Sequence, residues 1–177
     1  MKRTVYRYGF YSVLMLIGLS AIHLFILNKI LDFGTQEVIG YLTMLLSMVF
    51  VFLGIRYYRN KVNNGYLSFG QGLKIGTLIV LIPAVAFGLF DLLYTQVIDP
   101  SWGETYYEYQ KQKVMASMPA DQVNEKLQDL QKEKEMWSNP VILFLLMTVT
   151  VFIIGFIVTI ISTLTLMKKK KIQAQLS

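Results

Sequence analysis

The feature that most constrains this chain is a series of four long apolar stretches that are almost free of charge. Residues 10–27, 38–55 and 141–167 contain no Asp, Glu, Lys or Arg, and residues 75–98 contain only Asp91. A run of about 18 or more apolar residues is typical of a helix that crosses a bilayer. The sequence therefore predicts an all-α integral membrane protein with four transmembrane helices, at about residues 10–31, 38–58, 73–98 and 140–167.

Two other interpretations of the apolar stretches are weaker. Four buried helices of a soluble protein would carry charged residues on their outer faces, whereas the polar side chains within residues 141–167 are all Ser or Thr. The basic N-terminus and residues 10–27 also resemble a signal peptide, with Gly18-Leu19-Ser20 before Ala21 as a cleavage site. Because the apolar run continues to Leu27, we favour an uncleaved first span.

Charge asymmetry predicts the orientation of the spans. The N-terminus, the loop between spans two and three, and the C-terminus together carry eleven Lys and Arg and no Asp or Glu. The two remaining connections carry six Lys and ten Asp and Glu. Since Lys and Arg are enriched in cytoplasmic flanks, both termini are predicted to be cytoplasmic. The net charge of +6 then reflects topology, and no nucleic-acid partner is expected.

Residues 99–140 form the largest segment outside the spans, an extracytoplasmic insertion within one membrane domain of residues 1–177. Asp99-Pro100 ends span three, because a residue before proline disfavours the α conformation. Two helical stretches follow, and Ser117 is expected to cap the second. The segment is predicted to be a helical hairpin. It either binds a partner or caps a ligand, or its helices pack only on each other and on the membrane surface.

Small and polar residues recur along the predicted spans, where they let membrane helices approach closely. The economical interpretation is a compact four-helix bundle with these residues inward; the alternative turns one such face outward for homo-oligomerisation. Pro83 predicts a kink in span three, because proline removes a backbone hydrogen bond. The candidate helix-packing residues are Gly72, Gly76, Ala84, Gly88, Gly155 and Thr159.

His23 and Asp91 form a candidate intramembrane polar pair. Asp91 is the only acid within a span, and His23 is the only histidine. Ionisable groups in a membrane usually face a protein interior or water and have a partner. The helical rise places both residues at similar depth, so we expect them to meet directly or through water. In the alternative, Asp91 reaches water at the interface and His23 bonds a neighbouring hydroxyl.

Aromatic residues flank the predicted spans. Trp102, Tyr106, Tyr107 and Trp137 lie near the outer ends of spans three and four. An amphipathic ring prefers the headgroup region of a bilayer, so these four residues are interpreted as interfacial.

Two short patterns frame span three: Ser68-Phe69-Gly70-Gln71-Gly72-Leu73-Lys74 with Gly76 at its start, and Ile98-Asp99-Pro100 at its end. On these residues the chain resembles the family called domain of unknown function 4199. The resemblance implies a small four-span protein of bacterial inner membranes. It implies no established activity and brings no catalytic residues to carry over.

The sequence favours a non-enzymatic membrane component, either an accessory subunit, a scaffold or a small sensor. It contains no P-loop, no HExxH, no serine–histidine–acid set and no cysteine, so neither an enzyme nor a metal or cofactor site is expected. Besides the lipid bilayer, the expected partner is a second copy or an unidentified membrane protein that contacts residues 99–140. The alternative is a small oligomeric transporter or channel that uses Asp91 and His23.

Overall fold

The computed structural model describes residues 1–26 and 30–168, and their fold is all-α. The helices, with π-helical turns labelled η, are α1 (Lys2–Phe25), α2 (Phe33–Ser47), α3 (Val49–Tyr57), η2 (Tyr58–Val62), α4 (Phe69–Leu93), η3 (Tyr94–Ile98), α5 (Trp102–Ser117), α6 (Ala120–Trp137) and α7 (Pro140–Leu166). Four helical segments are long and apolar enough to span a membrane: Lys2–Phe25, Phe33–Val62, Phe69–Ile98 and Pro140–Leu166. The predicted fold class is therefore confirmed.

The helices extend beyond the apolar stretches that predicted them. α1 already begins at Lys2 and so includes the basic residues before the first apolar stretch. Charged side chains do not end a helix where they can project into water. α2 begins at Phe33, where the Asp32 carboxylate accepts hydrogen bonds from the backbone N–H (3.0 Å) and hydroxyl (2.6 Å) of Thr35. Residues 27–29, near the end of the first predicted span, and the basic run Lys169–Lys171 lie outside the described residues.

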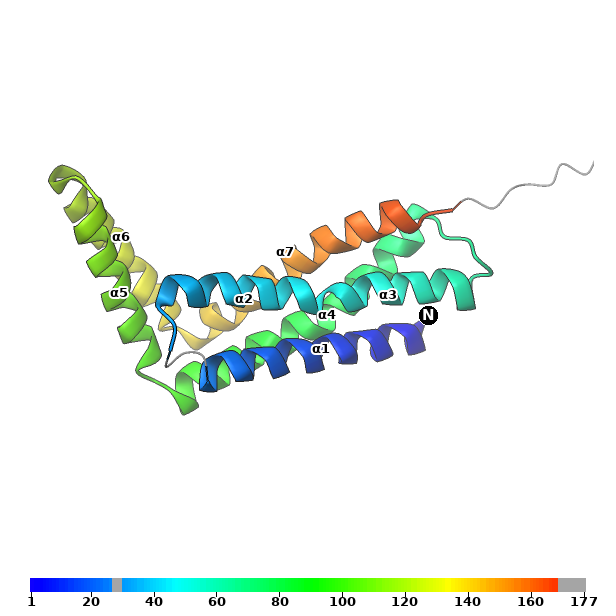
Figure 1. Ribbon diagram of the computed structural model, residues 1–177, viewed down its shortest axis with the longest axis horizontal. Coiled ribbons are helices and arrows are strands. Elements are labelled where there is room, and N and C mark those ends of the chain that lie inside the picture. Colours follow the sequence, from blue (N-terminus) through cyan, green and yellow to red (C-terminus); the bar gives the residue numbers. More distant parts are fainter. Residues whose placement is uncertain (27–29, 169–177) are drawn as a thin grey trace, which may run out of the picture.

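The four spans pack side by side, and the hairpin of α5 and α6 lies at one end of them (Figure 1). α4 packs against α7 and α1, and α3 packs against α1, α4 and α7. Figure 1 shows the start of α1, the end of α7 and the loop between η2 and α4 at the opposite end. The hairpin is set across the long axis of the spans. We call these two ends the hairpin end and the terminal end.

The α4–α7 contact depends on small residues. A Cβ added to Gly72 would lie 2.5 Å from Thr163 Cγ2, and a Cβ added to Gly155 would lie 2.5 Å from Val80 Cγ1. Close packing of this kind stabilises helices in lipid, where no hydrophobic difference drives them together. The structure places all six candidate packing residues in buried positions: Gly72, Gly76, Ala84, Gly88, Gly155 and Thr159.

The second span is interrupted near its middle, which the sequence analysis did not predict. α2 ends at Ser47 and α3 begins at Val49. Around Met48 the backbone bonds shorten to three-residue spacing, with the N–H of Val51 donating to the Met48 carbonyl at 3.0 Å. The Ser47 carbonyl instead accepts a hydrogen bond of 2.9 Å from the buried Ser12 hydroxyl of α1. A side chain that enters the backbone ladder is a recognised cause of helix interruption.

Two proline positions have different outcomes. α4 is a single helix from Phe69 to Leu93 with Pro83 buried inside it, so the predicted kink stays a prediction. Asp99-Pro100 does end span three, because η3 ends at Ile98 and Asp99 leaves the helical conformation.

The hairpin between spans three and four has the predicted helical form, but the predicted cap is wrong. The Ser117 hydroxyl donates to the Lys113 carbonyl of its own helix at 2.7 Å. α6 begins at Ala120 after Pro119, which has no side-chain hydrogen bond to offer. A serine in the last turn of a helix can bond back to the preceding turn, and this local bond replaces the cap.

Candidate functional site: a cleft beneath the hairpin

A cleft of about 810 Å³ lies at the hairpin end. Its walls come from α1, α2, α4 and α7, and the hairpin covers it with side chains from both α5 and α6. Its volume lies within the range of small-molecule sites in proteins. The cleft therefore joins the membrane-spanning helices to the hairpin in one candidate site.

The polarity of the cleft changes with depth. The wall that lies within the spans is mostly apolar and includes Met44, Phe87 and Met147, with Asp91 and Thr150 among its polar members. Its rim is polar and includes Glu37 and Gln96. Helical rise places Met44 roughly 16 Å below the start of α2, so the gradient runs along the axis of the spans.

The cleft is closed toward the terminal end by a layer of tightly packed side chains, which we call the floor. Met48, Val80 and Val151 form this layer and have no exposed surface. Gly155 lets the floor pack closely, since a Cβ added there would lie 3.0 Å from Met48 Sδ. Beyond the floor, Ile75 is also fully buried. Fully buried side chains therefore separate the cleft from the terminal end.

His23 and Asp91 both line the cleft, but they do not contact each other directly. His23 Nε2 and Asp91 Oδ2 are buried and have no hydrogen-bond partner. Among the described residues, no hydrogen bond or salt bridge joins the two side chains. The direct contact proposed from the sequence is absent, and a water-mediated contact stays a prediction. A buried polar group without a partner calls for an explanation, such as a water or a ligand.

A hydrogen-bonded cluster holds the hairpin to α2 at the rim. The Glu37 carboxylate accepts from the Tyr106 hydroxyl at 2.5 Å and from the Gln110 amide at 3.2 Å. The Gln110 amide also donates to the Tyr106 hydroxyl at 2.6 Å. Burial, and then the bond to Glu37, raise the pKa of Tyr106 above its usual value. Tyr106 therefore stays a neutral donor to the carboxylate at physiological pH.

A salt bridge joins the two helices of the hairpin. Lys134 Nζ of α6 lies 2.5 Å from the Glu104 carboxylate of α5 and 4.5 Å from the centre of the Tyr107 ring. The bond to Glu104 raises the pKa of Lys134. The pair is partly exposed, so it fixes the geometry of the hairpin more than it stabilises the fold.

The aromatic residues at the outer ends of spans three and four line the cleft, and their place at the membrane interface stays a prediction. The Trp102 and Tyr106 rings are stacked, with centroids 5.2 Å apart and planes within 6°. Trp137 lies 5.9 Å from the Tyr106 ring, and Tyr107 also lines the cleft. The indole Nε1 of Trp102 is buried without a partner. The rings therefore form part of the lid over the cleft.

Sequence reasoning missed the role of Glu37 and Gln110 in this site. Glu37 was counted only as a charge that sets topology, and its partner Tyr106 lies 69 positions away in the sequence. No local pattern signals a contact over that distance. The only local signal was the position of Glu37, directly before the apolar run that begins at Val38.

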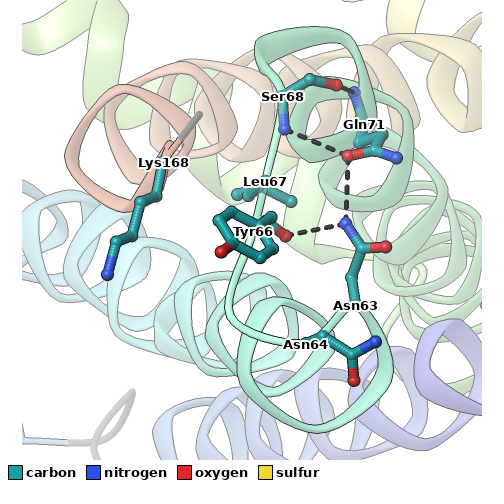
Figure 2. Close-up of a pocket in the computed structure, with 7 residues that line it drawn as sticks. All are labelled: Asn63, Asn64, Tyr66, Leu67, Ser68, Gln71 and Lys168. Carbon is teal, nitrogen blue, oxygen red and sulfur yellow. Dashed lines mark hydrogen bonds between the residues drawn. The ribbon is translucent and has the colours of Figure 1, made fainter. Parts of the chain in front are cut away.

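A second hollow of about 430 Å³ lies at the terminal end, in the loop before α4 (Figure 2). Figure 2 shows the Asn63 amide donating to the Tyr66 carbonyl and to Gln71 Oε1, at 2.7 and 3.3 Å. Ser68 and Gln71 form a capping box at the start of α4. Because these polar side chains satisfy one another, the hollow is explained by the architecture of the loop. Part of the glycine-rich pattern noted in the sequence, Ser68 to Gln71, lies here.

The fold and the cleft together define an all-α protein with four helices that can cross a membrane. The chain belongs to the DUF4199 family, described as a protein of unknown function, whose model matches residues 7–168. This match confirms the resemblance seen in the sequence. Comparisons with curated proteins and with solved structures give no significant match.

Proposed function

We propose that this chain is a non-enzymatic component of the bacterial inner membrane, a small sensor or accessory subunit, that binds a ligand in the cleft beneath its hairpin. The observation that carries the proposal is the cleft itself, which lies beneath the hairpin and is separated from the terminal end by the fully buried Met48, Val80 and Val151. A cleft of this kind suits binding, whereas permeation needs a path through the spans. The buried polar atoms without partners are consistent with a ligand that supplies those partners.

Gly40 offers a direct test of ligand binding. It lines the cleft, and a Cβ added there would meet no atom within 4 Å, so Gly40→Phe should fill the cleft without a clash at the backbone. Gly18→Phe is a matched control, because Gly18 is exposed, is equally open and does not line the cleft. Native mass spectrometry from mild detergent should find a bound small molecule in wild type and Gly18→Phe and not in Gly40→Phe. Bound mass that is equal in all three proteins, or absent from wild type, would contradict the proposal.

The proposed orientation has both termini in the cytoplasm and the hairpin outside. It is supported by charge, since the described Lys and Arg at the terminal end face no Asp or Glu there, while the acids gather at the hairpin end. The chain has no cysteine, so single-cysteine variants can be labelled without background. A membrane-impermeant maleimide should modify Gln128→Cys in intact cells and spare Asn63→Cys. The reverse pattern would overturn the orientation.

The second candidate function is a small transporter or channel in which Asp91 and His23 contact the transported species. One observation favours it: both side chains line the cleft with an unpartnered polar atom. Transport would require the floor to open. Purified protein in liposomes that contain a pH-sensitive dye should show no proton flux above empty liposomes. Flux that is lost in Asp91→Asn would favour the transporter instead.

The arrangement we propose for the spans is one compact four-helix bundle within each copy. Mass measurement in mild detergent distinguishes the partners left open by the sequence. A stable complex with another membrane protein through residues 99–140 fits an accessory subunit. A closed ring of identical copies fits the transporter.

A further inference from the structure

We propose that the cleft binds a membrane lipid with an amine-bearing head group, and that the Asp91 carboxylate accepts the hydrogen bond of the lipid's ammonium group. This inference rests on the proposed function and names the class of its ligand. It depends on three observations: the direction of the polarity gradient, the depth of Asp91 and the charge of the lining.

The polarity gradient of the cleft runs in the same direction as that of a lipid leaflet. The apolar wall at Met44, Phe87 and Met147 lies within the spans, and the polar rim lies under the hairpin. A lipid bound in the orientation it has in a leaflet can therefore place a chain against the wall and its head group near the rim. A water-soluble ligand would leave the apolar wall uncovered or bury polar groups against it, and the second choice is costly.

Asp91 lies near the boundary expected between the hydrocarbon and the lipid head groups. The third span, Phe69–Ile98, has 30 residues. Its length is roughly 45 Å, against a hydrocarbon core of about 30 Å, so several ångströms project at each end. Asp91 lies roughly 10 Å below the end of this span. It is therefore close to the boundary of the hydrocarbon, where a head group in the cleft can reach it.

The charge of the lining favours a cationic head group. The lining contains the acids Glu37, Asp91, Glu104 and Glu133 and the cations Lys126 and Lys134. Lys134 is paired with Glu104, and Glu37 is satisfied by the hairpin. Asp91 alone combines burial with an oxygen that has no partner. A charge-assisted bond from an ammonium group would supply that partner.

Trp102 supplies a second contact for the same lipid. Its buried indole N–H is an unpartnered donor, and it suits a phosphate or ester oxygen. Both unpartnered atoms are screened by their neighbours in this conformation, so the head group reaches them after rotation of the side chains. An anionic lipid without an amine would satisfy Trp102 and leave Asp91 without a donor.

The two tryptophans make the proposal measurable, because Trp102 and Trp137 are the only ones in the chain and both line the cleft. The full-length protein is placed in nanodiscs of phosphatidylcholine that contain a small, equal fraction of lipid brominated on its acyl chains. Bromine quenches tryptophan fluorescence at short range. Brominated phosphatidylethanolamine should quench with an apparent affinity about tenfold higher than brominated phosphatidylglycerol, which corresponds to about 1.4 kcal/mol. Free ethanolamine in solution should not reverse the quenching.

The preference should vanish in Asp91→Asn and persist in Asp91→Glu. Asp129→Asn is the matched control, because Asp129 is a hairpin acid that does not line the cleft. Should Asp91→Asn fail to fold, Trp102→Phe keeps Trp137 as the reporter and should weaken quenching by every phospholipid. Equal quenching by both lipids, a preference that survives in Asp91→Asn, or reversal by free ethanolamine would overturn the inference. None of those results changes the expectation that a small molecule is bound to wild type and absent from Gly40→Phe. A failure of this inference is therefore distinct from a failure of the proposed function.

Discussion

The contact of Gly88 with α7 allows the sharpest test of the packing. A Cβ added at this position would collide with the Thr148 hydroxyl and lie 2.9 Å from the carbonyl oxygen of Phe144. A side chain can rotate away from a new methyl group, but a backbone carbonyl of a helix cannot. Gly88→Ala should therefore push α7 away from α4 and loosen contacts along the interface.

The expected magnitude comes from comparison with Gly18→Ala. Alanine in a helix gains about 0.5–1 kcal/mol over glycine, and this gain applies equally at both positions. Gly18 has no atom within 4 Å of an added Cβ, so Gly18→Ala should be neutral or stabilising. Overpacking at Gly88 costs about 1–3 kcal/mol. The two variants should then differ by about 1–3 kcal/mol in free energy of unfolding.

The assay is titration of the detergent-solubilised protein with sodium dodecyl sulfate, followed by circular dichroism of the helices. The unfolding midpoint should fall for Gly88→Ala and hold or rise for Gly18→Ala. Equal midpoints would mean that α4 and α7 are farther apart than described, and that the small residues between them do not set their separation.

Three further changes test other parts of the fold. Ser12→Ala removes the hydrogen bond to the Ser47 carbonyl and should lower the free energy of unfolding by about 1 kcal/mol in the same titration; no change would mean that the break in the second span does not need this bond. Ser68→Ala removes the cap of α4 and should cost about 1 kcal/mol, while Ser68→Thr should restore most of it. The raised pKa of Tyr106 predicts stability that is fully present below the usual tyrosine value of 10.0 and is lost as pH rises through the higher folded value. Tyrosine ionisation is followed by ultraviolet absorbance in wild type and in Tyr106→Phe. The absorbance change that the variant lacks should belong to the tyrosine that ionises at the highest pH. Ionisation of Tyr106 at its usual pH would refute the buried contact with Glu37.

The number of spans could be predicted from the sequence because lipid imposes a simple requirement. Every backbone group in hydrocarbon must bond within its own helix, so a long uncharged stretch has few alternatives. Asp99-Pro100 was equally predictable, since proline acts on its immediate neighbour. Helix starts at Asp32 and Ser68 were missed, although both are cap residues and Ser68 with Gln71 forms a capping box. Hydropathy locates the apolar part of each span but does not give the residues at which its helix begins and ends.

The cleft could not be predicted because it depends on contacts between distant segments. The bond between Glu37 and Tyr106 exists only because the hairpin folds back over α2. His23 and Asp91 stand out in the sequence as ionisable residues of the spans, and both line the cleft. Their depth along a helix, however, does not give the direction in which each side chain points. The rotation of each helix is set by packing, here by the close contacts of α4 with α7. The similar depth of the two residues therefore did not imply a contact between them.

The interruption at Met48 divides the second span into two helices, α2 and α3, with different surroundings. The α2 unit forms a wall of the cleft, while Met48 and the α3 residues beyond it belong to the packed floor and core. At the junction the continuous four-residue ladder is already absent, so a small change of angle there strains fewer backbone bonds than bending an intact helix would. A change of angle there would alter the wall of the cleft and leave the packing of Met48, Val51 and Ile55 in place. The Ser12 hydroxyl of α1 donates to the Ser47 carbonyl, and this hydrogen bond holds the junction between α2 and α3 against the neighbouring helix.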